Sequence, residues 1–203
     1  MIRSGETLEN AVTGEALTFH TTSSETDGEF VRFETVLQPG GFVAAAHVHP
    51  RQDETFEVLE GNLGLRRGRE RLELGAGGVA AVAAGTPHRF WNAGDDEARF
   101  LCTIAPALQF ESLIETMFEL AGSGKTNRKG LPNPLQLAVI AQAHFETVRL
   151  PFPPAPLQRA ALAVGASLGR LVGYERYASV DPVQREHDWR VAPRPALPSG
   201  AGS

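Results

Sequence analysis

Three histidines and one glutamate in this chain have the types and spacing of ligands for a divalent metal ion. They lie in two short runs, residues 41–61 and 85–92, and are His47, His49, Glu54 and His88. The chain contains six histidines, so half of them fall in these runs. Imidazole nitrogens together with a carboxylate oxygen suit borderline first-row divalent ions. A metal site is therefore the first hypothesis about function.

The spacing of these residues predicts how strands must position them. His47 and His49 are two residues apart, so on an extended strand both side chains point to the same face. Pro50 lacks an amide hydrogen and is followed by polar residues, so the strand can end there. Glu54 can then re-enter on the next strand and face the same interior, whereas His88 must come from a strand far along the chain. Each imidazole would bind as a neutral ring, with its other nitrogen held by a neighbouring acceptor.

Residues 1 to about 106 show the pattern of a β-domain, in which short apolar runs alternate with Gly, Asn and Asp turns. Asp27-Gly28, between the first two runs, is a hairpin signal. Many short strands at regular spacing predict a sandwich or a small barrel. The strands expected are residues 17–21, 30–37, 42–49, 54–59, 63–66, 71–74, 79–82, 88–92 and 99–105.

After Pro106 the apolar residues recur at helical spacing. Helices are expected around residues 110–121, 137–148 and 157–172, and the prolines between 151 and 156 predict a stiff linker before the third. Glycines spaced by four on that helix would permit close packing on the barrel or on a second subunit; they are Gly165, Gly169 and Gly173.

Composition narrows the class of protein. A net charge of −5 argues against a nucleic-acid-binding surface. Cys102 is the only cysteine, so no internal disulfide is possible and a reducing, cytoplasmic setting is favoured. The first ten residues lack the apolar core of a signal peptide, and the apolar part of the third helix is too short to cross a bilayer. We therefore expect no membrane segment.

The two histidine-containing runs also resemble the motifs of a known family. Residues 41–61 fit the first cupin motif, G-x5-H-x-H-x4-E-x6-G, at every fixed position. Residues 77–92 resemble the second, G-x5-P-x-G-x2-H-x3-N, with Ala83 where the family usually has a proline that is not a ligand. The resemblance covers roughly residues 17–106. It implies a mainly β fold, the cupin double-stranded β-helix or jelly-roll barrel, with the metal inside.

The expected organisation is therefore a cupin β-barrel followed by about three C-terminal α-helices. We assign residues 1–108 to the barrel, 109–178 to the helical extension and 179–203 to a flexible tail, because the tail is rich in Pro, Gly, Ser and Ala. A homodimer is expected, since cupins commonly dimerise and the amphipathic helices must bury their apolar faces.

The resemblance further implies a function at the four-residue cluster. His47, His49, Glu54 and His88 would hold one divalent ion (Fe, Mn, Ni or Zn), and Glu54 is also the candidate catalytic residue because it could exchange protons. Open coordination positions and a net charge of about +1 favour a small anionic substrate, such as an enolate, carboxylate or phenolate. Small metallocupins resemble dioxygenases, which makes a dioxygenase the first expectation. The alternatives are an isomerase, cyclase or decarboxylase, and a non-enzymatic small-molecule-binding protein.

Two further sets of residues are candidates for ligand contacts. Five phenylalanines could line the barrel around an aromatic substrate, although ordinary core packing is the alternative for each: Phe33, Phe42, Phe56, Phe90 and Phe100. A basic loop near residues 125–134 carries Lys125, Arg128 and Lys129, and is either a solvated loop or an anion contact. His144, on the apolar face of its helix, is expected to be a core histidine rather than a fifth ligand.

Overall fold

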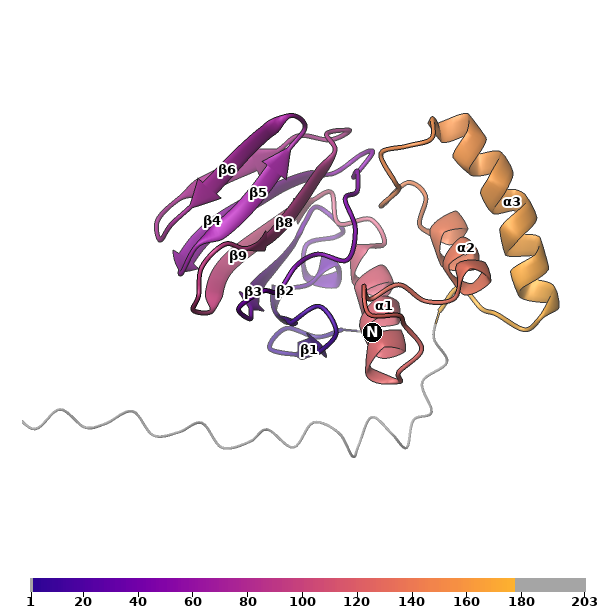
Figure 1. Ribbon diagram of the computed structural model, residues 1–203, viewed down its shortest axis with the longest axis horizontal. Helices are drawn as coiled ribbons and strands as arrows, with labels where there is room; N and C mark the ends of the chain where they lie inside the picture. Colours follow the sequence, from indigo (N-terminus) through magenta and orange to yellow (C-terminus); the bar gives the residue numbers. More distant parts are fainter. Residues whose placement is uncertain (1, 178–203) are drawn as a thin grey trace, which may run out of the picture.

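The computed structural model describes residues 2–177, which form a β-domain followed by three helices (Figure 1). The tail expected over residues 179–203 lies outside the described residues. The strands are β1 (Thr7–Asn10), β2 (Glu15–Thr21), β3 (Val31–Leu37), β4 (Asp53–Glu60), β5 (Leu63–Arg67), β6 (Glu70–Leu74), β7 (Val79–Val82), β8 (His88–Asn92) and β9 (Ala98–Ala105). The helices are the single 3-10 turn η1 (Ser23–Glu25), α1 (Phe110–Gly122), α2 (Pro134–Ala143) and α3 (Ala155–Leu171).

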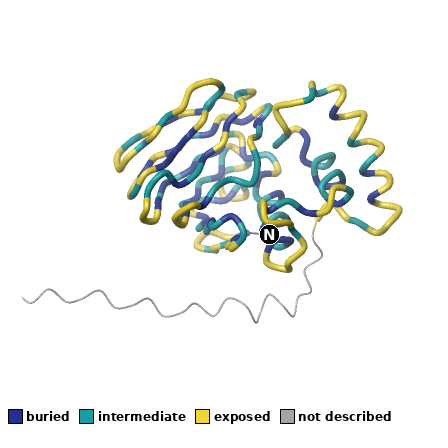
Figure 2. The backbone as a smooth tube through the Cα atoms, viewed as in Figure 1, coloured by how far each residue is buried: buried dark blue, intermediate teal, exposed yellow. Residues whose placement is uncertain are grey.

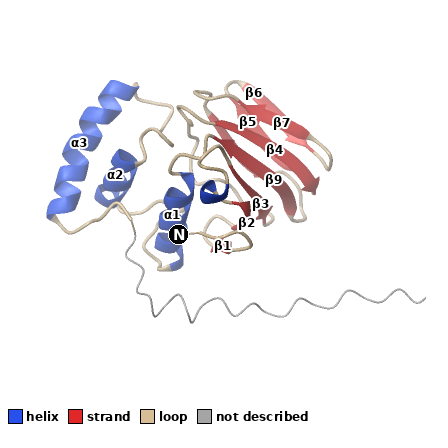
Figure 3. Cartoon of the chain, turned by 180° about the vertical axis from the view of Figure 1, so that it is seen from behind, coloured by secondary structure: helices blue, strands red, loops and turns tan. Residues whose placement is uncertain are grey.

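The strands form two antiparallel sheets, one with the order β1-β2-β3-β9-β4-β7 and one with the order β6-β5-β8. Along β3 and β9 every second residue is buried, the alternation expected when one face of a sheet covers a core. Figure 2 shows buried stretches along the strands and largely exposed loops at their ends, and in Figure 3 the helices lie to one side of the sheets. The expected mainly β fold with three C-terminal helices is confirmed.

The strand expected over residues 42–49 is the main point where the prediction was wrong. This segment meets β8 only at two isolated bridges, Phe42↔Trp91 and His47↔His88. Between the bridges lie three consecutive alanines, residues 44–46, whose backbone makes no ladder with β8. The histidines therefore sit on an extended but irregular segment. β1 was not anticipated from the sequence.

The second helix is shorter than expected, and this difference matters for the site. Asn133 caps α2 by accepting a hydrogen bond from the Leu135 amide at 2.9 Å, and Pro134 occupies the first turn. The helix ends at Ala143, whereas the apolar period continues to residue 148. The chain then runs back to the β-domain, where the backbone groups of Val48 and Arg149 bond each other at 2.8 and 3.0 Å.

α3 packs on α2 through its glycines. A Cβ added at Gly165 would lie 3.0 Å from the Ala138 Cβ, and one at Gly169 would lie 2.6 Å from the Val139 Cγ2. The close approach predicted from glycine spacing is thus present, but its partner is α2 and not the barrel. The opposite side of α3 exposes Leu157, Val164, Leu168 and Leu171. Within residues 2–177, no helix is both long and apolar enough to span a membrane.

Candidate metal centre

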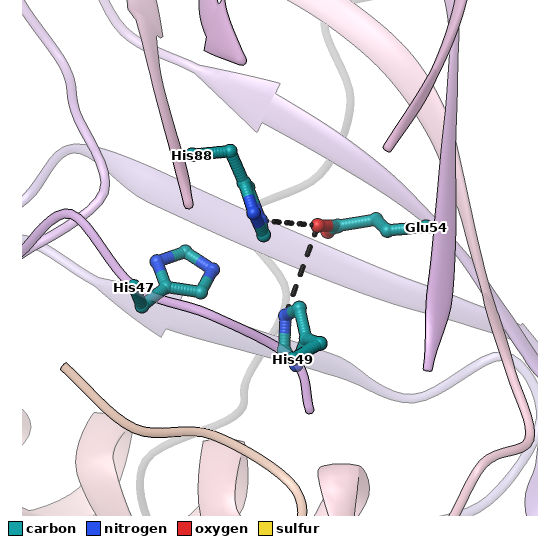
Figure 4. Close-up of side chains that lie close together, drawn as sticks. All are labelled: His47, His49, Glu54 and His88. Carbon is teal, nitrogen blue, oxygen red and sulfur yellow. Dashed lines mark ion pairs between the residues drawn. The ribbon is translucent and has the colours of Figure 1, made fainter. Parts of the chain in front are cut away.

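The fold brings the four residues singled out from the sequence into one cluster. His47 and His49 come from the irregular segment beside β8, Glu54 from β4 and His88 from β8. One ligand-competent atom of each lies within 4.8 Å of those of the other three. Figure 4 shows the side chains converging from these separate segments. His49, Glu54 and His88 are at most 4% exposed, whereas His47 is half-buried.

All three imidazoles are oriented in the same way. The Nδ1 atoms of His47 and His88 each donate to a backbone carbonyl at 3.0 Å, those of Ala45 and Thr86. The Nδ1 of His49 donates to the Thr147 carbonyl at 2.7 Å. Because a carbonyl oxygen can only accept, each Nδ1 carries a proton, and the Nε2 of each neutral ring presents a lone pair. A backbone acceptor behind each ring is the usual support of a metal-binding histidine.

The atoms at the centre of the cluster lack the partners that buried polar atoms require. The Glu54 Oε2 lies 2.7 Å from the His88 Nε2 and 3.7 Å from the His49 Nε2. Neither Glu54 Oε2 nor His88 Nε2 has a partner with hydrogen-bond geometry among the described residues. Lone pairs that face each other in a buried space need a cation or a proton between them.

The separations within the cluster fit one ion. Donor atoms bound at about 2.1 Å lie about 3 Å apart when adjacent and about 4.2 Å apart when opposite. The 2.7 and 3.7 Å separations and the 4.8 Å upper limit are close to those values. The donor set and the orphaned atoms therefore both fit a divalent metal.

Electrostatics keep two of the donor groups, Glu54 and His47, in the forms that a metal binds. Burial raises the pKa of Glu54, but contact with His88 and the charges of the neighbouring imidazoles outweigh it and lower that pKa to about 2. Desolvation, followed by the charges of His88 and His49, lowers the pKa of His47 to about 3. Burial lowers the pKa of His88, but Glu54 outweighs it and the net shift is upward. At neutral pH the carboxylate is therefore ionised and His47 is neutral, whereas the raised pKa of His88 means that protons compete with an ion for this ring more than for His47.

Cys102 contacts the cluster, although the sequence did not indicate it. Its Sγ donates to the Glu54 Oε1 at 3.2 Å, inside the core. Burial, reinforced by the charge of Glu54, raises the pKa of this thiol well above 9, so it stays protonated and remains a donor. The thiol thus fixes one oxygen of Glu54 and leaves Oε2 for the centre of the cluster. β9, which carries Cys102, pairs with β4, which carries Glu54. The contact results from this strand pairing and has no signal in the sequence.

The helical extension also contributes to the site, through residues that sequence reasoning missed. Thr147 lies in the return segment after α2, and its carbonyl orients His49. Phe110, the first residue of α1, faces the His49 ring with centroids 6.2 Å apart, and stacks on Phe33 at 5.2 Å. His144, which precedes Thr147 in the chain, is also buried, but it is not a member of the cluster.

The five candidate phenylalanines do not share one environment. Phe33, Phe56, Phe90 and Phe100 belong to the buried core. Phe56, Phe90 and Phe100 pack against one another with centroids 5.6 to 5.9 Å apart. Phe42 is half-buried and bridged to Trp91, so it shares the outward direction of that residue. Phe33 is linked to the histidines through Phe110, whose ring contacts both Phe33 and His49.

With this geometry in place, comparison with known proteins identifies the β-domain. Residues 33–104 match the family model described as "Cupin domain". The matched range runs from within β3 to within β9 and includes all four residues of the cluster. These residues therefore form a cupin domain, and the resemblance read from the two motifs is confirmed.

Individual relatives match only part of the chain. One curated protein, polyketide synthase CurC of Streptomyces cyaneus, is 32% identical over 78 residues, which are 38% of this chain and 50% of that protein. The match thus spans half the length of that relative. A cupin-superfamily sugar phosphate isomerase from Silicibacter pomeroyi is 29% identical over 47% of this chain and 62% of its own, with a TM-score of 0.42. A protein from Thermotoga maritima described as a predicted oxalate decarboxylase is 21% identical over 52% and 98%, with a TM-score of 0.46.

Proposed function

We propose that this chain is a metal-dependent enzyme that holds one divalent transition-metal ion at the cluster in its cupin domain. The ligands are His47, His49, Glu54 and His88. One observation carries this proposal. Three imidazoles, each oriented by a backbone carbonyl, converge with an ionised carboxylate, and two of the central atoms, Glu54 Oε2 and His88 Nε2, are buried without a hydrogen-bond partner among the described residues. Three nitrogens and one oxygen suit Fe(II), Mn(II), Ni(II) and Zn(II).

When bound, such an ion would supply Lewis acidity, or bring dioxygen and substrate together. The protein's own residues orient the donors and exclude water. Three carbonyls hold the imidazoles, the Cys102 thiol holds Glu54, and the Phe110 ring covers one side of His49. His47 is the least buried of the four, so we expect substrate to approach from its side. Glu54 remains the candidate to exchange a proton with substrate.

The first reaction that we propose is dioxygenation of a small aromatic or enolisable anion. A divalent ion with one carboxylate and three neutral imidazoles keeps a charge of about +1, which favours an enolate, a carboxylate or a phenolate. Four protein ligands leave one or two coordination positions for substrate and dioxygen. The aromatic pair Phe33 and Phe110 beside His49 supports an apolar, planar substrate.

A second candidate is the same site acting without dioxygen, as a cyclase, isomerase or decarboxylase. The 32% identity to a polyketide synthase protein over 78 residues favours it, because polyketides carry carbonyl groups that enolise. A Lewis acid that stabilises an enolate would serve such a reaction. A third candidate is a cupin that binds a small molecule without converting it.

Metal content is the first test. The protein is purified beside the double variant His47→Ala, His49→Ala and the control His20→Ala, whose histidine lies on β2 away from the cluster. We expect close to one metal ion per chain in the wild-type protein and in the control, and much less in the double variant. Equal metal contents in all three proteins would refute the site.

Oxygen consumption then separates the reactions. Metal-loaded protein is mixed with diketone, flavonol and hydroxy-aromatic acid substrates in an oxygen electrode and, in parallel, under nitrogen. Consumption coupled to product formation supports a dioxygenase. Turnover that persists under nitrogen refutes the dioxygenase and supports the second candidate, whereas metal binding without turnover of any substrate supports the third.

We also propose that the protein is a cytoplasmic homodimer. Cys102 is free and buried, as in proteins of a reducing compartment. The outer side of α3 exposes Leu157, Val164 and Leu171, at 61%, 64% and 82%, and apolar exposure of this kind favours a partner surface. Light scattering coupled to size exclusion should give twice the mass of one chain. A monomer at micromolar concentration would contradict the dimer.

A further inference from the structure

A groove on the outer face of the three-stranded sheet has the character of a second ligand site. Its volume is about 540 Å³, within the range of small-molecule sites. In β8 the side chains of His88 and Phe90 are buried, whereas Arg89 is exposed and Trp91 half-buried. Side chains alternate along a strand, so Arg89 and Trp91 point away from the core while His88 points into it. None of the four cluster residues lines the groove, which is therefore distinct from the metal cluster.

One part of this groove is a flat aromatic platform. Trp91 lies over Gly64, its register partner on β5. A Cβ added at Gly64 would lie only 2.2 Å from the Trp91 Cε2, so the absence of a side chain at 64 is what lets the indole lie against the sheet. Phe42, bridged to Trp91 from the neighbouring segment, extends the apolar surface. The three alanines at residues 44–46 line the groove as well.

Basic side chains surround the platform. The Cζ atoms of Arg71 and Arg89 lie 5.1 and 5.6 Å from the centroid of the Trp91 ring, and Lys129 reaches the groove from the basic loop after α1. Among the described residues none of these three cations forms an ion pair, and no acidic residue lines the groove. Glu73 shares this face of the sheet by register but is not among the lining residues.

The charge of the groove is opposite in sign to the net charge of the chain. The whole chain carries a net charge of −5, yet this groove gathers three cations and no anion. Arginine side chains beside an indole combine two recognition modes, since the guanidinium bonds carboxylate or phosphate oxygens while the ring stacks on a flat apolar body. The alternative raised from the sequence, that the basic loop contacts an anion, is in keeping with the position of Lys129.

We propose that this groove binds a small planar anion, a conjugated ring system that carries a carboxylate or phosphate group. The ring stacks on Trp91 against Phe42, and the anionic group lies between Arg71, Arg89 and Lys129. The site needs no metal and is independent of the function proposed for the histidine cluster.

The test uses 2-naphthoate as the probe and metal-free, full-length protein. A Trp189→Phe background leaves Trp91 as the single tryptophan, so quenching of its fluorescence reports on the groove, and isothermal titration calorimetry provides a second readout. The neutral analogue naphthalene-2-carboxamide tests the charge. Arg71→Gln combined with Arg89→Gln removes two lining cations. Arg66→Gln is the matched control, because Arg66 pairs in register with both arginines and is exposed but does not line the groove.

We expect saturable binding of 2-naphthoate that the double variant weakens by about tenfold or more and that Arg66→Gln changes by less than about twofold, because the double variant removes two of the lining cations that bond the anion, whereas Arg66 does not line the groove. The carboxamide should bind at least about tenfold more weakly. Absence of binding, equal binding of the carboxamide, or equal effects of Arg66→Gln and the double variant would overturn the proposal. Binding that is lost in His47→Ala, His49→Ala but kept in the arginine variant would place the ligand at the histidine cluster instead.

Discussion

Replacement of Cys102 by alanine should weaken metal binding without removing any metal ligand. The thiol is the donor that holds the Glu54 Oε1 at 3.2 Å, and both side chains are buried. In Cys102→Ala this oxygen loses its partner in a place that water does not reach. The carboxylate then has freedom to rotate, and the geometry with which Oε2 faces His49 and His88 is no longer fixed.

The size of the effect follows from the strength of this bond. A hydrogen bond to a charged group contributes about 1.5–3 kcal/mol, and a thiol is a weak donor, so a value near the lower end applies. A loss of about 1.4 kcal/mol is tenfold in a binding constant. We therefore expect the dissociation constant for the metal to rise about tenfold, within the range found when groups that support metal ligands are removed.

The assay is a competition between the protein and a chromophoric chelator for Zn(II) at neutral pH. Cys102→Ser, which keeps a hydroxyl donor, should stay within about threefold of the wild-type protein. Val58→Ala is the control for core truncation, because Val58 is a buried residue of the same strand as Glu54 but lies outside the cluster.

Two results would refute the reasoning. One is a Cys102→Ala protein that binds Zn(II) as tightly as the wild type. The other is a loss of affinity in Val58→Ala as large as that in Cys102→Ala, since this would trace the effect to general loosening of the core.

Three further predictions concern the stability of the β-domain. Burial raises the pKa of Glu15 from 4.5 to about 7 although the Thr13 hydroxyl bonds it, so the folded state holds a proton that the unfolded state releases. The free energy of unfolding should therefore fall by about 3 kcal/mol as pH rises from 4.5 to 7, relative to Glu15→Gln, and parallel urea-denaturation curves for the two proteins across this range would contradict it. Gly61→Ala should destabilise by at least about 2 kcal/mol in the same assay, because Gly61 has φ +72° and an added Cβ would lie 2.3 Å from the Glu97 carbonyl oxygen; an unchanged midpoint would count against this reading. Phe56→Ala should cost about 3–5 kcal/mol, since Phe56 is fully buried in the aromatic core, and a loss below about 1 kcal/mol would show that the core can collapse into the space.

Much of the fold could be predicted because its signals are local. The strands β3 to β9 fall within one or two residues of the expected ranges, since alternation of apolar residues and glycine turns depend only on neighbouring positions. The failures have tertiary causes. Residues 42–49 have the pattern of a strand, but the chain bulges at the three alanines. α2 ends before its apolar period does because Thr147 and Arg149 bond to the β-domain instead.

For the site, the sequence by itself determined which side chains could act as ligands, because residue type and the spacing of His47, His49, Glu54 and His88 are written in the chain. Only the tertiary structure decided how they are held. The Thr147 carbonyl lies 98 residues beyond His49, and the Cys102 thiol lies 48 residues beyond Glu54. Neither contact leaves a local pattern, because a backbone carbonyl is present at every residue and a single buried thiol resembles any core side chain. The groove around Trp91 has the same origin, since sheet pairing gathers its cations from separate strands and a distant loop.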